Sequence, residues 1–183
     1  MKTSKGNLKL PVSIGIFNQP AIKTCNPYHC KDCKSICYAI RAEKRFPAAK
    51  KSRAHNLRES KKSTFIVNMT SHIANMRVKT FRIHESGDFY NQTYLDGWVS
   101  VAKALPNIQF YAYTKSIDLD FSKRPTNLRI IASVPCNDLD GVALVVNKGI
   151  TLAGFLACPG SCKTCSYCYS NGKSFRKIAF TIH

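Results

Sequence analysis

The sequence is poor in acidic residues and has no long uninterrupted hydrophobic run. Ten Asp and Glu residues stand against 28 Lys and Arg residues, so the chain carries a formal net charge of +18. The longest apolar stretch joins residues 141–146 to 150–157 and is interrupted by Asn147, Lys148 and Gly149. A membrane-spanning helix needs about 20 consecutive apolar residues, so we expect no membrane segment. The positive excess favours anionic partners, with nucleic acid first among them.

The first residues also lack the features of a secretory leader. Residues 1–19 contain no long apolar stretch and no small-residue cleavage site, so we expect a protein of a reducing cytoplasm. No low-complexity linker divides the chain, and 183 residues suit one domain. A hydrophobic content of 44% is enough to build a core. We therefore predict a single metal-binding domain over residues 1–183.

Predicted strands alternate with predicted helices over the first two thirds of the chain. Strands are expected in residues 8–17, 80–89, 108–114 and 128–134, and helices are expected after Cys37, from Pro47, from Ser63 and after Asn91. Residues 142–146 and 150–156 are predicted to pair as a hairpin, and residues 177–183 form a last strand. This order predicts an α/β fold, with a mainly parallel sheet or partial (β/α) barrel and a short β-rich C-terminal part.

Eight of the nine cysteines are concentrated in two short segments. The first cysteine segment (residues 25–37) and the second cysteine segment (residues 158–168) contain Cys25, Cys30, Cys33 and Cys37, and Cys158, Cys162, Cys165 and Cys168. In a reducing compartment, clustered thiols are more often metal ligands than disulfides. We predict that all eight bind metal. Cys136 stands alone, as is typical of a small buried apolar side chain.

The spacing of the second cysteine segment favours an iron–sulfur cluster over zinc. Structural zinc usually uses two Cys-x2-Cys pairs separated by a dozen or more residues, a separation that neither segment contains. Cys162, Cys165 and Cys168 follow one another at intervals of three, which resembles the run that wraps a 4Fe–4S cluster in ferredoxins. We expect one or two such clusters and keep zinc as the alternative.

Polar residues gather around the predicted strand and turn at residues 80–89. Arg82 and His84 are predicted to share one face of the strand. Asp88 lies in the turn after it, where α/β sheets place their ligand sites. These three residues are the candidate catalytic groups, and the candidate cofactor-binding residues are Ser86, Gly87 and Lys115. The alternative is a buried polar belt in which these groups only satisfy one another.

The sequence resembles the phage gene-product-eighty-eight family. The matching pieces are Thr24-Cys25, Cys37-Tyr38-Ala39, Asn56-Leu57, FRIHESGDFY, YTKS, the CP…TCSYCY run and the closing IAFTIH. The resemblance implies a phage origin more than an activity. It points to the cysteines of both segments except Cys30, and to Arg82, His84, Gly87, Asp88 and His183.

A looser similarity of architecture is to radical S-adenosylmethionine enzymes, in which a cysteine loop follows the first strand and a glycine-acid turn follows the second. That superfamily's usual triad is Cys-x3-Cys-x2-Cys, whereas Cys30, Cys33 and Cys37 have the reverse order of spacings. We therefore expect no S-adenosylmethionine.

Two functions from different classes follow from these patterns. The leading hypothesis is a phage-type iron–sulfur protein, redox-active or catalytic, whose basic surface contacts nucleic acid through the Lys/Arg patch at residues 44–62. The alternative is a zinc-stapled nucleic-acid-binding module without catalysis.

Overall fold

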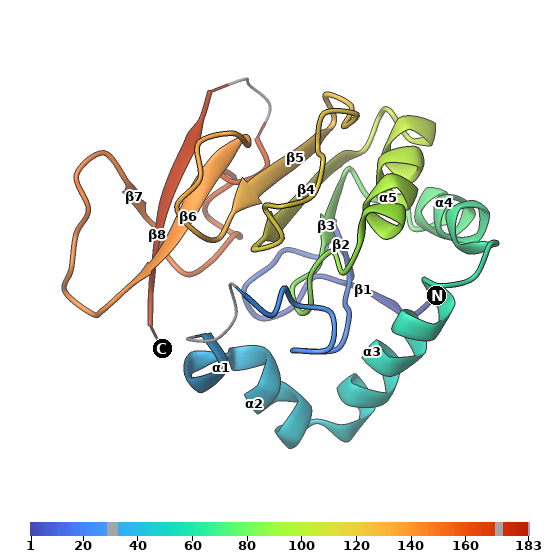
Figure 1. Cartoon of the computed structure of the whole chain (residues 1–183), viewed down its shortest axis with the longest axis horizontal. Coiled ribbons are helices and arrows are strands. Elements are labelled where there is room, and N and C mark those ends of the chain that lie inside the picture. The colour runs from blue at the N-terminus through green and yellow to red at the C-terminus, as the bar shows by residue number, and fades with distance from the viewer. Residues whose placement is uncertain (29–32, 171–173, 183) are drawn as a thin grey trace.

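The fold is organised around one open, mostly parallel sheet (Figure 1). The computed structural model describes residues 1–28, 33–170 and 174–182. The eight described strands lie in the order β1-β2-β3-β4-β5-β6-β8-β7, with β1 and β7 at the two edges and no closure into a barrel. Among the described strand pairs, only β1–β2 is antiparallel. The strands are β1 (Thr3–Lys5), β2 (Ile14–Phe17), β3 (Thr80–Ile83), β4 (Gln109–Thr114), β5 (Leu128–Ala132), β6 (Gly141–Val146), β7 (Leu156–Ala157) and β8 (Arg176–Thr181).

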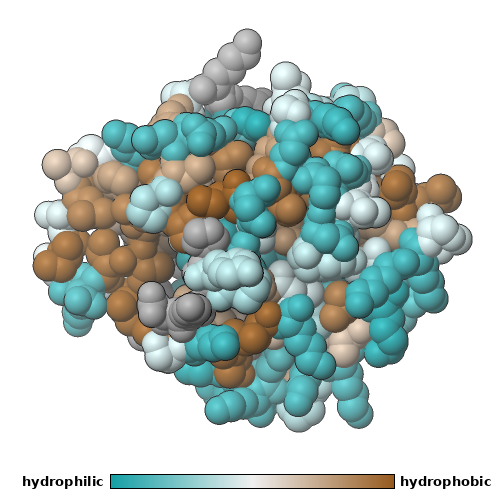
Figure 2. Space-filling model, viewed as in Figure 1, coloured by the Kyte–Doolittle hydropathy of each residue, from teal (hydrophilic) through white to brown (hydrophobic). Residues whose placement is uncertain are grey.

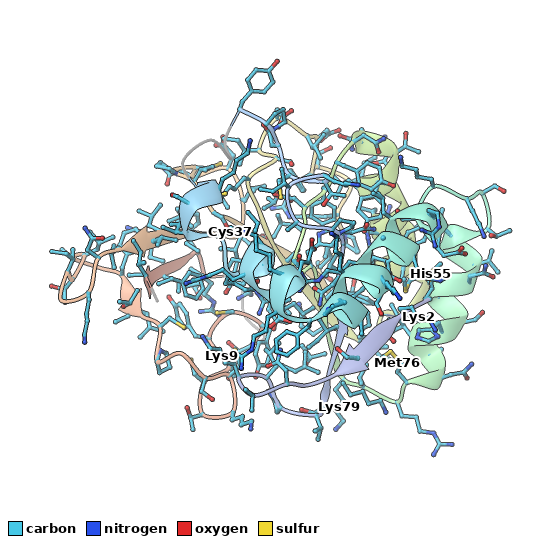
Figure 3. The ribbon with its side chains drawn as sticks, turned by 90° about the horizontal axis from the view of Figure 1, so that it is seen from below. Lys2, Lys9, Cys37, His55, Met76 and Lys79 are labelled. Carbon is cyan, nitrogen blue, oxygen red and sulfur yellow. The ribbon has the colours of Figure 1, made fainter. Side chains whose placement is uncertain are left out.

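The described helices form two groups. The long helices α4 (Phe65–Asn75) and α5 (Gln92–Ala104) lie together beside the strands. The helices α1 (Cys33–Ile36), α2 (Tyr38–Arg45) and α3 (Pro47–Glu59) instead form an arc along the lower side of the molecule (Figure 1). Seen from below, α2 and α3 cross in front of the sheet, with Cys37 at the start of α2 and His55 on α3 (Figure 3).

One face of the sheet is covered by α4 and α5. Because side chains alternate along a strand, Phe81 and Ile83 of β3 point to this face and pack with Trp98 in the larger buried cluster. Asn91 begins α5 as predicted, and its Oδ1 accepts a 2.9 Å hydrogen bond from the Tyr94 backbone N–H. The helix predicted after Asn91 is confirmed, and its apolar residues at helical spacing form part of this core.

The opposite face of the sheet is covered by the irregular second cysteine segment. Tyr111 of β4 and Ile131 of β5 are buried there, together with Ile178 of β8. Cys168 is buried in the same cluster, and Cys158 and Cys162 pack against its margin. The segment therefore occupies the layer that a helix commonly fills in an α/β fold.

The parallel strands bring most candidate residues to one edge. The first cysteine segment follows β2, residues 84–88 follow β3, Lys115 follows β4, and Cys158 follows β7. Because β2, β3, β4, β6, β7 and β8 run in the same direction, their carboxyl ends meet at one edge. The expected α/β arrangement is confirmed in this respect.

Three local predictions were wrong. The hairpin at residues 142–156 does not form, because β8 lies between β6 and β7 and is parallel to both. Helix α4 begins one residue later than a Ser63 cap requires, and its N-cap is Thr64 without a side-chain bond. The predicted first strand over residues 8–17 is only Ile14–Phe17, and the antiparallel strand β1 was missed. Pro47 does begin α3, as predicted.

Candidate functional site

The second cysteine segment is held against the sheet by its backbone. The Cys158 N–H donates to the carbonyl of Ala179 in β8, and the Cys162 N–H donates to the carbonyl of Lys9, both at 2.8 Å. A hollow of about 390 Å³ at the opposite, amino edge of the strands is lined by Tyr169 together with Lys79. The segment therefore crosses the sheet from its carboxyl edge toward its amino edge.

The four thiols of this segment influence one another electrostatically. Burial raises the pKa of Cys162, and the neighbouring Cys158 and Cys165 raise it further while Arg82 lowers it. Burial also raises the pKa of Cys168 to about 11, against a hydrogen bond from Tyr113 that lowers it. Cys162 and Cys158 raise the Cys168 pKa as well. The fold thus gathers the four predicted ligands of this segment into one electrostatically coupled group.

Arg82 is a cation that interacts with Cys162 and Cys168 of this segment. It lies on β3 opposite Tyr111, and its guanidinium carbon is 5.9 Å from the Tyr111 ring centre and 5.4 Å from that of Tyr113. Burial opposes its charge, but the nearby Tyr111, Tyr38 and Glu85 raise the pKa of Arg82 above its usual value. The guanidinium therefore stays charged beside the segment.

Two buried donors beside the thiols have no hydrogen-bond partner in the described part of the chain. They are Nε of Arg82 and the hydroxyl of Tyr111. A buried donor without an acceptor typically costs about 1–3 kcal/mol. Both side chains interact electrostatically with Cys162 or Cys168. An added acceptor among the thiols would remove this cost.

Tyr38, which directly follows the first cysteine segment, interacts electrostatically with the same arginine. Cys37 is the N-cap of α2 and precedes Tyr38, whose ring is half exposed. Burial raises the pKa of the Tyr38 hydroxyl to about 12, while Arg82 lowers it. Cys25 and Cys33 of the same segment are half-buried. Cys30 lies outside the described residues, as do His29 and His183.

The thiols suit a metal cluster in kind, but they do not converge on one point. Between residues 1–28, 33–170 and 174–182, no three Cys, His, Asp or Glu side chains are arranged to hold one metal ion. Thiolates are soft ligands that select iron–sulfur clusters, zinc and copper. The suitability of this segment for a metal cluster therefore rests on the ligand type and on the unpartnered donors of Arg82 and Tyr111.

Asp88 is buried at the carboxyl edge and joins two strand ends. Its carboxylate accepts hydrogen bonds from the Thr114 hydroxyl at 2.6 Å, the Lys115 N–H at 2.7 Å and the Phe89 N–H at 2.7 Å. Burial raises its pKa to about 6 although these bonds lower it. No salt bridge to Arg82 forms within the described residues. The alternative in which Asp88 pairs directly with Arg82 in a buried belt is therefore not supported by the described contacts.

His84 lies on the other face of the sheet from Arg82, which corrects the prediction of a shared face. Its backbone φ of 63° leaves the extended conformation and turns the side chain toward α5. The ring Nε2 is 2.8 Å from the Tyr94 hydroxyl, and the ring packs edge-on against Phe89. Burial, reinforced by Arg82, lowers the pKa of His84 to about 3. The imidazole is therefore neutral near pH 7.

The remaining candidate residues serve the same turn. The Ser86 hydroxyl donates to the Gln19 carbonyl at 2.9 Å. Gly87 has a φ of 83°, and a Cβ there would lie 2.6 Å from the Thr24 Oγ1. The Lys115 ammonium donates to the Ser133 carbonyl at the end of β5. Arg82, His84 and Asp88 thus lie in the same region of the fold, but each interacts with different partners.

The sequence places Tyr113 and Thr114 at the end of a strand, but it does not by itself identify the partners of these residues. Tyr111 and Tyr113 line the face that carries Arg82, and Thr24 and Thr114 anchor the Asp88 turn. Alternation along β4 is a signal that places both tyrosines on one face. Which face of β3 they meet depends on the β3–β4 register.

These features define a cysteine-rich α/β protein with one helix-covered sheet face and one face covered by a cysteine segment. The chain belongs to the Gene product 88 family, whose model matches residues 1–138. That match includes the first cysteine segment and the Asp88 turn. It ends before the second cysteine segment, so it is shorter than the near-complete resemblance expected from the sequence.

Two mycobacteriophage proteins are similar to this chain. The Gene 88 protein of Mycobacterium phage L5 is 29% identical over 160 residues, which cover 77% of this chain and 66% of that protein. The Gene 88 protein of Mycobacterium phage D29 is 28% identical over 160 residues with the same shares. The chain therefore spans slightly less than two thirds of the length of these relatives. Their origin supports the expected phage character.

No solved structure matches the chain, and the similarity to radical S-adenosylmethionine enzymes finds no support among the matches. Among the described helices, none has the length and apolar character needed to cross a membrane.

Proposed function

We propose that the chain is an iron–sulfur protein whose cluster is held by Cys158, Cys162, Cys165 and Cys168. The observation that carries this proposal is the pair of unpartnered donors, Arg82 Nε and the Tyr111 hydroxyl, buried beside coupled thiols. Sulfur atoms of a cluster accept hydrogen bonds from such groups, and these bonds help to set its reduction potential.

A cluster accounts for the arrangement of the thiols better than a single zinc ion. Zinc bound at about 2.3 Å by tetrahedral thiolates requires the sulfurs to converge on one point. The described thiols affect one another's pKa without such convergence. A cubane takes each thiolate at a separate iron, so ligands distributed around a volume suit it. Zinc in the same segment remains the alternative.

The chain's own residues would provide the environment for the cluster. A 4Fe–4S cluster with four thiolates carries a net charge of about −2 and supplies one-electron chemistry. Arg82 would balance part of this charge, and Tyr113 would donate to the Cys168 sulfur. The Ile131 and Ile178 side chains beneath the segment would limit water. Exposed cysteinyl clusters require reducing conditions, so we propose a cytoplasmic location in the host cell.

Anaerobic purification tests the iron–sulfur proposal. The expected product is brown, absorbs broadly near about 400 nm, and contains iron and acid-labile sulfide in similar amounts. A folded, colourless protein that contains zinc and no sulfide would establish the zinc alternative instead.

A second candidate function is contact with nucleic acid through α2 and α3. The predicted Lys/Arg patch lies on these helices and on the turn after α3. Its exposed members are Lys44, Arg45, Lys50, Lys51, Arg58, Lys61 and Lys62. Arg53 was wrongly assigned to this exposed patch, because it is buried and its NH1 group lies 3.1 Å from Glu43. The side chains over α2 and α3 are mainly hydrophilic (Figures 1 and 2). Such a surface is suited to bind phosphates without reading sequence.

The salt dependence of binding tests this second function. Each phosphate contact contributes about −0.9 to the slope of log affinity against log salt on duplex DNA and about −0.7 on single strands. Reversing the charges of Lys50, Lys51, Lys61 and Lys62 should flatten that slope. If the wild-type protein binds no nucleic acid even at low salt, the patch is only a solvated surface.

A further inference from the structure

The exposed surface of α2 and α3 leaves its cations available to a partner. The two acidic residues of these helices are both engaged. Glu43 accepts a 2.9 Å hydrogen bond from the Ala21 N–H and pairs with the buried Arg53. Glu59 pairs with Lys62 at 2.7 Å. The field outside the helices is therefore dominated by positive charge, which attracts a polyanion.

The two helices are fastened to the body from their inner side. Arg53 NH1 donates to the Ala39 carbonyl at 3.1 Å, which joins α3 to α2. Asn56 Nδ2 donates to the carbonyls of Lys2 and Asn18 at 2.7 and 2.9 Å. These buried polar contacts hold the inner side, so the outer side presents a rigid surface.

An aromatic ring projects at the corner where α2 ends and α3 begins. Phe46 is 54% exposed, although large aromatic side chains are usually buried. Its backbone is held in place, because its N–H donates to the Ala42 carbonyl at 2.8 Å and its carbonyl accepts from the Ala49 N–H at 3.0 Å. Pro47 further restricts the corner. The ring is thus displayed by rigid backbone.

The surroundings of Phe46 are cationic. The guanidinium carbon of Arg45 lies 5.4 Å from the ring centre, within range of a cation–π interaction. Lys44 and Lys50 are exposed on the adjacent turns of α2 and α3. An exposed ring flanked by cations is the combination used to bind single strands, in which bases stack on aromatics and cations contact the backbone.

We infer that α2 and α3 bind single-stranded nucleic acid, with Phe46 as the platform on which one base stacks. This inference rests on the proposed nucleic-acid contact and names its partner. In a duplex the bases are already stacked on each other, so the ring gains a base only at the cost of unstacking. Lys44, Arg45 and Lys50 contact the phosphates on either side of the stacked base.

Fluorescence anisotropy with the full chain tests this inference. The probes are a labelled oligothymidylate of about 16 nucleotides, within the usual range of single-strand site sizes, and a duplex of equal length. The single strand is expected to bind more tightly. Phe46→Ala should weaken single-strand binding by about 5- to 150-fold, which corresponds to the 1–3 kcal/mol of one stacked base. Duplex affinity and the salt slope should stay unchanged.

Two matched variants control for fold and for general loss of apolar surface. Phe46→Trp should retain single-strand affinity because tryptophan also stacks. Val67→Ala truncates an apolar side chain on α4 that is 68% exposed and lies outside the patch. It should leave both affinities unchanged.

The possible failures separate the inference from the function on which it rests. Normal single-strand binding by Phe46→Ala, with weak binding by Lys50→Glu, would overturn stacking and leave the phosphate contact standing. Equal affinity for the duplex and the single strand would also overturn it. Absence of binding to both probes at low salt would overturn the inference and the nucleic-acid function together. None of these three outcomes bears on the iron–sulfur proposal.

Discussion

The hydroxyl of Thr114 donates a 2.6 Å hydrogen bond to Oδ1 of Asp88, which joins the end of β4 to the turn after β3. The Lys115 N–H completes the connection by donating to the other carboxylate oxygen. On the third side, the Asp88 N–H donates to the Thr24 hydroxyl at 3.2 Å. One buried residue, through its carboxylate and its backbone N–H, therefore connects three segments at the carboxyl edge.

The raised pKa of Asp88 predicts a pH dependence of stability. Burial raises this pKa from 3.8 to about 6 in the folded protein, so the folded chain holds a proton that the unfolded chain has released. The contribution of Asp88 to the free energy of unfolding is fully present below about pH 4 and is lost as the pH rises through 6. At 1.36 kcal/mol per pKa unit, the loss is at most about 3 kcal/mol.

Urea denaturation of the wild type and of Asp88→Asn at several pH values checks this. The difference in unfolding free energy between the two proteins should change between pH 4 and 6 and be flat above 7. At neutral pH we expect the variant to be about 1–3 kcal/mol less stable, because the Lys115 N–H would face an amide donor. Equal stability at every pH would contradict the structural role.

Gly87 and Gly149 make a matched pair for testing backbone strain. Their φ angles are 83° and 86°, but only Gly87 has neighbours where a Cβ would stand. Gly149→Ala should cost about 1–2 kcal/mol, the penalty of a left-handed conformation. Gly87→Ala should cost several kcal/mol because Thr24 and Gln19 must also move. Thermal unfolding measures both, and similar costs would refute the close approach.

Substitution of cysteines in the second cysteine segment should reduce metal content, whereas substitution of Cys136 should not. Cys162→Ser and Cys165→Ser should each yield metal-poor, less soluble protein, because metal binding contributes to folding free energy. Cys136→Ser is the control, since Cys136 borders a separate hollow with Leu139 and Phe121. Its iron and sulfide content after anaerobic purification should match the wild type. Equal iron content in all three variants would remove the second segment from the ligand set.

Arg82 predicts a shift in the reduction potential of the proposed cluster. A unit charge several ångström away at an effective dielectric of about 20 changes the energy of the reduced state by a few kcal/mol. Arg82→Gln should therefore lower the potential by on the order of 100 mV, while Arg82→Lys should retain most of it. Potentiometric titration followed by electron paramagnetic resonance measures the shift. A potential unchanged in Arg82→Gln would remove Arg82 from the environment of the cluster.

The sequence by itself determined the elements whose signals are local. The Asn91 cap and the apolar stripe of α5 lie within one short window, as does the Pro47 start of α3. Continuous apolar runs likewise predicted β4 and β5. The spacing of the cysteines in the two segments and the family resemblance could also be identified from the sequence. Each of these signals depends only on neighbours along the chain.

The tertiary structure alone decided which of those residues meet. A backbone φ of 63° at His84 separates its side chain from Arg82, and no periodicity predicts that angle. Asp88 finds its partners 26 and 27 residues later, at Thr114 and Lys115, because β3 and β4 are adjacent and parallel. Strand order and register are set by the packing of the whole sheet, so contacts across them depend on distant residues rather than on local spacing.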